Sequence, residues 1–207
     1  MSKAAGNINL VIGDGSTWSM RAWMSLNLAG IDFEEIVIPL SGDDYKAALS
    51  KHSDTMLVPV LRANNIKIHD SLAIAEFANE LSDGALYPKD LNARSVCRSL
   101  CAELHSGFPL IRNNCPYYLD GKKTYTSTVE LEKEINRIKE IWSKAEGQFY
   151  FGAPSLADVF YSVMAHRLFN YDVQLSVDAR QYQNNLLEWD LFKSVLEQAK
   201  AWQGMSF

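Results

Sequence analysis

Three short groups of residues in this chain have the types and positions needed to bind or activate a ligand. The first is the run Ser16, Thr17 and Ser19, which follows a β-branched stretch, Ile8 to Gly13, and opens a long apolar segment. Hydroxyl groups at a helix start accept hydrogen bonds from unpaired amides, so helix capping accounts for these residues. A hydroxyl in that position could instead activate a bound ligand. Both interpretations stay open at this stage.

The second group surrounds Pro59 in the apolar stretch Leu57 to Leu61. A proline inside a strand pattern normally indicates an edge strand. The alternative is a cis peptide bond between Val58 and Pro59, a rare feature that is associated with tight local geometry. A cis bond there would turn the backbone amide and carbonyl of Val58 toward an extended, peptide-like ligand.

The third group is Asp70 and Ser71, which directly precede an apolar pattern with helical spacing. Capping explains both residues without a ligand. A helix start is also an anion site, because its free amides and a serine hydroxyl can hold a carboxylate. Asp70 could then receive an ammonium group, so a zwitterionic amino-acid end is the ligand that would satisfy both residues.

The elements around these groups predict a small α/β domain. Strand and helix patterns alternate over the first eighty residues in the order β-α-β-α-β-β-α, which favours parallel first strands and a final hairpin around Asn64 and Asn65. Strand signals then nearly vanish. We therefore predict a small α/β domain over residues 1–82, a linker over 83–90, and an all-helical bundle domain over 91–207.

Two patterns support the helical domain. One predicted helix carries a single apolar stripe and a charged opposite face, and the stripe consists of Leu131, Ile135, Ile138 and Trp142. A later helix opens with Ser155 and Asp158 at the spacing of a capping box, which indicates a folding signal rather than a binding site.

Composition limits the function further. The chain has 207 residues, a net charge of −5 and a pI near 5.4, with 47% hydrophobic residues. An acidic chain without a basic run argues against nucleic acid and against an anionic membrane surface as partners. The odd number of cysteines fits a reducing compartment, so we expect a cytoplasmic protein.

The cysteines and one histidine raise the question of a metal site. Cys97, Cys101 and His105 are spaced to share one stripe of a helix. Three ligands on one straight helix cannot easily surround a tetrahedral ion, so burial in the core is the better interpretation and no metal is expected. We expect a structural role for Cys115 as well.

Taken together, the three groups and the domain order resemble those of the cytosolic glutathione transferases. The opening "STWSMRAWMSLNLAGIDFEEIVIPL" is similar to the "SSWSLRPWL…AGIPFEE" opening of a serine-type bacterial subgroup. The segments "AELHSGFPLIRNNCP" and "FGAPSLADVFYSVMAHRLFNYDVQL" resemble the helical domain of that subgroup. The resemblance covers nearly the whole chain, and it implies a thioredoxin-like domain followed by a helical one.

The resemblance also implies a set of glutathione contacts. Asp70 and Ser71 would hold the γ-glutamyl end of glutathione. Leu57, Val58 and the cis Pro59 would lie along its cysteinyl part. Among the hydroxyls near the sulfur, Ser16 is favoured, Thr17 is the first alternative and Ser19 the second.

The second substrate, by the same resemblance, is a small hydrophobic electrophile. His105, Phe108 and Arg112 are candidates for its pocket, and a kinked core helix is the alternative reading of that segment. Met56 and Leu57 depart from the family pattern, because many relatives have a glycine and a basic residue there. Any contact that relies on a cation at that point is lost.

The sequence therefore predicts a homodimeric glutathione S-transferase that stabilises the glutathione thiolate and conjugates it to an electrophile in detoxification. The first alternative is a glutathione-dependent isomerase of the maleylacetoacetate isomerase type. The second is a glutathione-binding stress protein without catalysis, which the altered run before Val58 keeps open.

Overall fold

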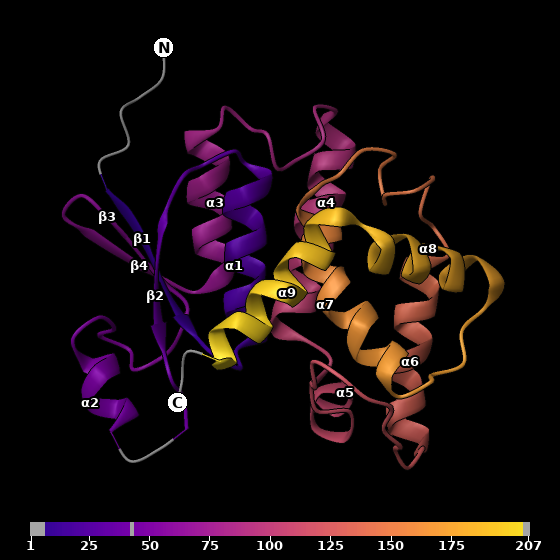
Figure 1. Ribbon diagram of the computed structural model, residues 1–207. Coiled ribbons are helices and arrows are strands. Elements are labelled where there is room, and N and C mark those ends of the chain that lie inside the picture. The colour runs from indigo at the N-terminus through magenta and orange to yellow at the C-terminus, as the bar shows by residue number, and fades with distance from the viewer. Residues whose placement is uncertain (1–6, 42–43, 205–207) are drawn as a thin grey trace. The chain divides into compact units, whose positions relative to one another are not determined.

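The computed structural model describes residues 7–41 and 44–204. The chain divides into two compact units (Figure 1). One unit runs to Leu86 and takes in the last helix from Ser194 on, and the other is Tyr87–Lys193. Each unit is described by itself.

The described residues of the first unit form a four-stranded sheet in the order β2-β1-β3-β4. Its strands are β1 (Ile8–Gly13), β2 (Glu34–Ile38), β3 (Val60–Ala63) and β4 (Ile66–His69). β1 pairs with β2 in parallel and with β3 antiparallel, and β3 and β4 form a hairpin. The predicted order of elements along the chain, the parallel pairing of the first two strands and the final hairpin are confirmed.

Three helices cover this sheet: α1 (Thr17–Leu28), α2 (Tyr45–Ser50) and α3 (Ser71–Leu81). α1 and α3 lie side by side, and α2 lies on the opposite side of the sheet (Figure 1). Leu49 of α2 packs with Val11, Ile38 and Val60 in one apolar cluster. Because side chains alternate along a strand, the central β1 is apolar toward both layers and almost completely buried.

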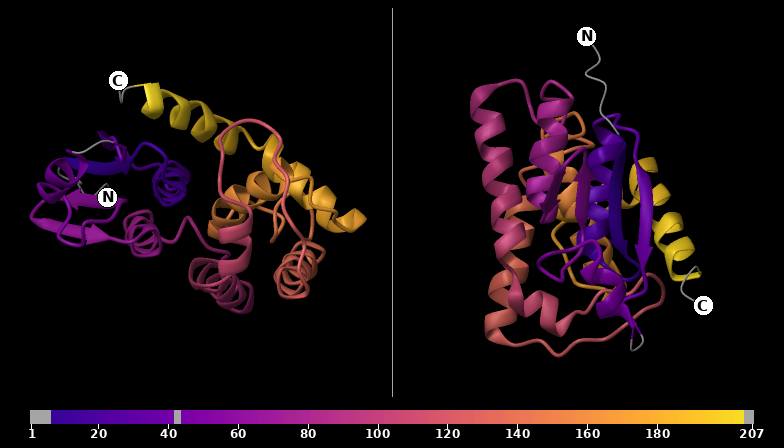
Figure 2. Two further views of the ribbon diagram at one scale, coloured as in Figure 1. Left: turned by 90° about the horizontal axis from the view of Figure 1, so that it is seen from below. Right: turned by 90° about the vertical axis from the view of Figure 1, so that its left-hand side faces the viewer.

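The second unit is helical. Its helices are α4 (Leu91–Ser106), α5 (Pro109–Asn114), α6 (Val129–Trp142), α7 (Leu156–Asn170) and α8 (Val177–Glu188), and α9 (Asp190–Gly204) begins in it. α4 and α6 are seen nearly end on in the view from below (Figure 2, left). Gly107 ends α4 and Pro109 begins α5, as predicted for that break. The fold class is therefore confirmed: an α/β unit of the thioredoxin type and a helical unit.

α7 is the centre of the second unit, because each of its residues except Phe169 is buried. The predicted capping box is present at its start: Asp158 Oδ2 accepts hydrogen bonds from the Ser155 amide (2.9 Å) and hydroxyl (2.8 Å). The other carboxylate oxygen accepts from Tyr182 Oη at 2.7 Å. This box serves folding, as the sequence indicated.

The end of α9 packs with the first unit through Glu35 of β2. One oxygen of this carboxylate accepts from Gln198 Nε2 at 2.8 Å and from Trp202 Nε1 at 2.7 Å. The other accepts from Trp23 Nε1 at 2.7 Å. The predicted limits of 1–82 and 91–207 assign all of α9 to the helical domain, and they do not anticipate this packing.

Candidate functional site

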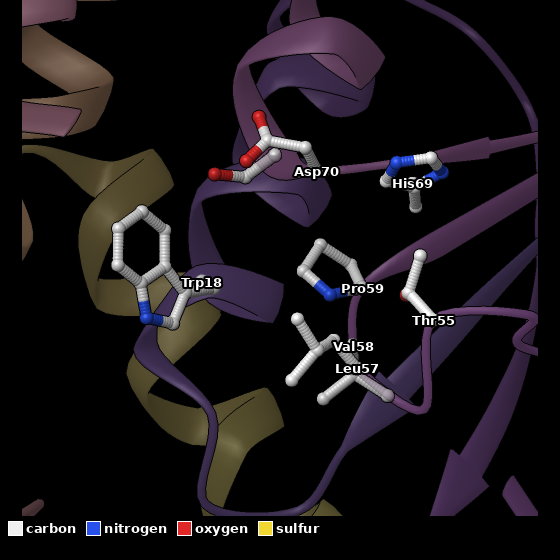
Figure 3. Close-up of a pocket in the computed structure, with 8 residues that line it drawn as sticks. Trp18, Thr55, Leu57, Val58, Pro59, His69 and Asp70 are labelled. Carbon is white, nitrogen blue, oxygen red and sulfur yellow. The ribbon is translucent and has the colours of Figure 1, made fainter. Parts of the chain in front are cut away.

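A pocket of about 300 Å³ lies in the first unit, where α1, the loop before β3 and the start of α3 meet (Figure 3). Five of the predicted glutathione contacts line it: Leu57, Val58, Pro59, Asp70 and Ser71. Trp18, Thr55 and His69 complete the lining. The volume falls within the range of about 300–1,000 Å³ that is usual for small-molecule sites.

The peptide bond between Val58 and Pro59 is cis, as the sequence allowed. The alternative, an edge strand, is wrong, because β3 begins only at Val60 and lies between β1 and β4. Pro59 thus precedes the hydrogen-bonded residues of β3, where a proline could not donate a backbone hydrogen bond. It is buried, whereas Leu57 is 68% exposed at the rim of the pocket.

Two neighbouring features fix this loop. The buried Ser53 hydroxyl accepts from the Leu57 amide (3.1 Å) and donates to the Leu57 carbonyl oxygen (2.8 Å), which closes the turn before Val58. Gly13 ends β1 against the same loop. A Cβ at Gly13 would lie 2.7 Å from Val58 Cγ2 and 2.5 Å from Leu40 Cδ1, so any side chain there would force Leu40 and Val58 to shift.

Asp70 and Ser71 form the start of α3. Asp70 Oδ1 caps the helix by accepting from the Leu72 amide (2.8 Å) and more weakly from the Ala73 amide (3.4 Å). Asp70 has φ +80° and ψ +132°, a backbone conformation outside the left-handed helical region that few residues other than glycine adopt. Its carboxylate lies beside the pocket, across from Trp18 (Figure 3).

Ser71 differs from a residue that only caps a helix. It is 1% exposed and lines the pocket, and within residues 7–41 and 44–204 its hydroxyl oxygen has no hydrogen-bond partner. A buried hydroxyl without a partner carries a desolvation cost of roughly 1–3 kcal/mol. The capping interpretation therefore accounts for Asp70 but leaves the Ser71 hydroxyl unexplained.

The three hydroxyls of the opening run have different surroundings. Ser16 is the N-cap of α1, and its half-buried Oγ accepts from the Ser19 amide at 3.3 Å. Ser19 is completely buried, and its Oγ accepts from the Gly13 amide at 3.1 Å. Thr17 is 8% exposed at the first helical position. Capping uses a lone pair of Ser16, so its O–H remains able to donate.

The carboxylate of Asp14, whose charge would oppose a thiolate close by, is hydrogen-bonded to another segment of the protein. Its Oδ1 accepts from the Leu40 amide at 3.0 Å. This bond ties the turn after β1 to the segment after β2. The carboxylate thus has a structural task in the loop that precedes Ser16.

The predicted electrophile contacts lie in the second unit. Arg112 of α5 donates to two carbonyl oxygens at the end of α4, those of Leu104 (2.5 Å) and Gly107 (3.1 Å), and burial lowers its pKa. Phe108 is 5% exposed with φ +60° between α4 and α5, and His105 packs near the Phe160 ring. These contacts explain why the chain bends there.

The cysteines are free and buried, in agreement with the packing interpretation. Burial raises the pKa of Cys115 to about 11, which makes it a poor nucleophile. Among the residues that the structure describes, no group of three or more metal-ligating side chains comes together.

Sequence reasoning missed three residues of the pocket lining: Trp18, Thr55 and His69. Trp18 comes two residues after Ser16, and His69 directly precedes Asp70, so both lay beside groups already singled out. Trp18 also stacks under Arg21, whose Cζ lies 4.5 Å from the centre of the indole ring. Proximity to a predicted site residue was the signal that could have found them.

Comparison with known proteins gives a consistent result. Residues 15–81 match the family model of the glutathione S-transferase N-terminal domain. Glutathione S-transferase Z2 of Arabidopsis thaliana is 27% identical over 164 residues, which cover 75% of this chain and 74% of the relative. Maleylacetoacetate isomerase of Rattus norvegicus is 26% identical over 168 residues, 78% of each chain.

A solved structure extends the likeness to both units. The glutathione transferase homologue from Burkholderia, determined with bound glutathione, superposes with a TM-score of 0.73 at 20% identity, over 95% of this chain and 99% of that one. None of the helices in the described part of the chain has the length and apolar character needed to span a bilayer. The chain has the glutathione transferase fold, and its first unit matches the N-terminal domain of that family.

Proposed function

We propose that the chain is a glutathione transferase that binds glutathione in the pocket of its first unit. The observation that carries this proposal is the Ser71 hydroxyl, which is buried in the pocket wall without a partner at the start of α3. A ligand carboxylate would accept its hydrogen and would also face the positive end of the helix. Such a ligand removes the cost of the unpaired hydroxyl.

The γ-glutamyl end of glutathione has the matching chemistry. Its carboxylate fits Ser71, and its ammonium group fits the negative charge of Asp70 beside it. The cysteinyl part would then extend along Leu57, Val58 and the cis Pro59, where the Val58 backbone offers an amide and a carbonyl. We keep these five residues as the proposed glutathione contacts.

Ser16 is the proposed activating residue for the sulfur. The surroundings described above favour it over Ser19, whose hydroxyl is completely buried, and leave Thr17 as the alternative. Lowering the thiol pKa by two units takes about 2.7 kcal/mol, at 1.36 kcal/mol per unit. One hydrogen bond to a charged group supplies about 1.5–3 kcal/mol, so a hydroxyl at the positive end of α1 suffices without a general base.

The reaction follows from the thiolate. Its sulfur attacks an electrophilic carbon, a sulfur–carbon bond forms, and the leaving group departs with its bonding electrons. In an addition, the carbanion formed instead takes a proton from water. His105, Phe108 and Arg112 remain the proposed contacts of this second substrate.

A second candidate function, a glutathione-dependent isomerase, is favoured by two neighbouring arginines of the second unit, Arg112 and Arg167. Arg167 is 6% exposed, donates to the Cys115 carbonyl oxygen at 2.7 Å, and lies over the Tyr117 ring. Burial and the neighbouring Arg112 lower its pKa to about 10. Two close guanidinium groups suit an anionic substrate, such as an unsaturated dicarboxylate, to which the thiolate adds reversibly while the double bond rotates.

Two assays separate these functions from a binding protein without catalysis. Calorimetry measures glutathione binding. Turnover is then measured with a chloronitroaromatic compound and with a cis-unsaturated dicarboxylate such as maleylacetoacetate. Conjugation of the first supports the transferase, and glutathione-dependent cis–trans conversion of the second supports the isomerase. If glutathione binds but neither reaction occurs, the non-catalytic alternative remains. If glutathione does not bind, the proposal is contradicted.

The proposal includes a homodimer in the cytoplasm. The family likeness supports the dimer, and sedimentation of the purified chain tests it. The three free cysteines support a reducing compartment, because thiols persist there. Imaging of the tagged protein in its own cells tests the location.

A further inference from the structure

The two ends of the pocket in the first unit differ in chemistry. In Figure 3, Asp70, Pro59, Val58 and Leu57 follow one another across the pocket from top to bottom. The Asp70 end carries a negative charge and the start of α3. If the proposed function holds, a tripeptide thiol that begins there and passes Val58 ends at Leu57. The residues at the Leu57 end then decide which terminal group of the ligand is bound best.

The Leu57 end offers no lysine or arginine to a terminal carboxylate. Leu57 is 68% exposed, and none of the described residues that line the pocket is a lysine or an arginine. Lys67 lies two positions before His69 in β4, on the same face of the strand, but its ammonium group is paired with Asp54 at 2.8 Å. A ligand carboxylate would therefore gain no ion pair from the lining.

Thr55, which also lines the pocket, offers an acceptor instead. Its Oγ1 lies 3.2 Å from the Oγ of the buried Ser53. Ser53 has one hydroxyl hydrogen, which it donates to the Leu57 carbonyl oxygen at 2.8 Å. Thr55 is therefore the donor in its bond with Ser53. Because the hydroxyl hydrogen of Thr55 is used in this way, its oxygen can only accept from a ligand.

We propose that the pocket selects γ-glutamyl thiols that end in an uncharged carboxamide over those that end in a free carboxylate. His69 lies on the same side of Pro59 as Thr55, away from Trp18 (Figure 3), and a histidine ring has at least one N–H in either protonation state. A carboxamide can accept from His69 through its oxygen and donate to Thr55 through its nitrogen. A carboxylate has no hydrogen to donate, so it would place its charge beside the Thr55 oxygen.

Calorimetric titration of the full chain with three thiols tests this selection. The thiols are glutathione, glutathione with its glycine converted to the primary amide, and glutathione with its glycine converted to the ethyl ester. We expect the Kd of the amide to be about threefold or more below that of glutathione, because the amide gains one neutral hydrogen bond. The ester is also uncharged but has no N–H at its end, so its Kd should lie within about twofold of that of glutathione.

Four variants assign the selection to named residues. Thr55→Val should abolish the preference for the amide, and Thr55→Ser, which keeps the hydroxyl, should retain it. Leu57→Lys should reverse the preference, because it supplies a cation to the carboxylate of glutathione. The matched control is Met56→Lys, which adds the same charge at an exposed neighbour outside the pocket lining and should leave the preference unchanged.

The outcomes separate this proposal from the proposed function. If glutathione binds as tightly as the amide, or more tightly, the selection is overturned and the proposed function stands. A preference that persists in Thr55→Val also overturns the proposal, and so does an ester that binds as tightly as the amide, because Thr55 would then not be the cause. If none of the three thiols binds, the proposed function fails as well.

Discussion

The carboxylate of Glu35 accepts a hydrogen bond of 2.7 Å from the indole nitrogen of Trp202, although 167 positions separate the two residues along the chain. Glu35 lies in β2 and Trp202, completely buried, in α9. Trp23 and Gln198 donate to the same carboxylate. Side chains of α1 and α9 thus converge on one carboxylate of β2.

Glu35→Gln should lower the free energy of unfolding by about 2 kcal/mol, because hydrogen bonds to a charged acceptor become hydrogen bonds to a neutral one. Urea denaturation followed by tryptophan fluorescence measures the change. Glu34→Gln is the matched control, since this exposed neighbour accepts only from Asn9 among the hydrogen bonds described here, and it should change stability by less than about 0.5 kcal/mol. Equal effects of the two variants would contradict the role given to Glu35.

Asp70→Asn should weaken glutathione binding while keeping the fold. Asparagine caps helices and tolerates a positive φ as aspartate does, so thermal unfolding should stay nearly unchanged. The loss of charge removes the partner of the glutathione ammonium, and we expect the calorimetric Kd to rise about tenfold or more. A glutathione analogue without the amino group should bind both proteins equally. If Asp70→Asn raises the Kd of that analogue more than the Kd of glutathione, Asp70 does not act through the amino group.

Ser16→Ala should suppress turnover and raise the pKa of bound glutathione by one to two units, the loss of about 1.5–3 kcal/mol at 1.36 kcal/mol per unit. Thiolate absorbance during a pH titration measures that pKa. Ser176→Ala removes a comparable N-cap, that of α8, and controls for the lost cap, which is worth about 1 kcal/mol. If Thr17→Ala raises the thiol pKa and Ser16→Ala does not, the activating hydroxyl is Thr17.

Cys115 should make the protein less stable in alkali. Burial raises the thiol pKa from 9.0 to about 11 in the folded chain. Above pH 9 the unfolded thiol ionises while the folded one keeps its proton, so the unfolded state binds fewer protons and stability falls with rising pH. The stability that the protonated thiol contributes is fully present below pH 9 and is lost as the pH rises to 11. For a pKa difference of two units, the free energy of unfolding falls by up to about 2.7 kcal/mol.

Cys115→Ala should therefore flatten the fall in the free energy of unfolding between pH 9 and 11, measured by urea denaturation at each pH. Cys97→Ala is the control. The hydrogen bond from Cys101 lowers the pKa of Cys97, so its removal should not flatten the fall. An unchanged slope in Cys115→Ala would show that the thiol ionises alike in both states.

Much of the fold could be predicted because its signals are local. β-branched runs, the turn at Asn64 and Asn65, and the break at Gly107 each act within a few residues. The cis bond before Pro59 could be stated only as one of two options, because a proline in an apolar run fits both. The packing of α9 on Glu35 could not be predicted, since a helical pattern shows an apolar face but not its partner.

The candidate site was predictable to a similar degree. Residues with distinctive chemistry, Asp70 and Ser71 above all, could be named from their place before a helix. Trp18 and His69 lie beside these groups in the sequence, but only the three-dimensional arrangement of α1 and β4 shows that both line the same pocket. Likewise, the sequence could not show that Asp70 is engaged in capping while the hydroxyl of Ser71 is left over.

The most direct test is calorimetric titration of glutathione into the wild-type chain and into Ser71→Ala. The account predicts one glutathione per chain for the wild type, and a Kd at least about tenfold higher in Ser71→Ala with no loss of thermal stability, because the substitution removes an unpaired buried hydroxyl. Ser25→Ala, which removes a buried and paired hydroxyl of α1, should bind glutathione as the wild type does. No measurable binding by the wild type, or an unchanged Kd in Ser71→Ala, would contradict the account.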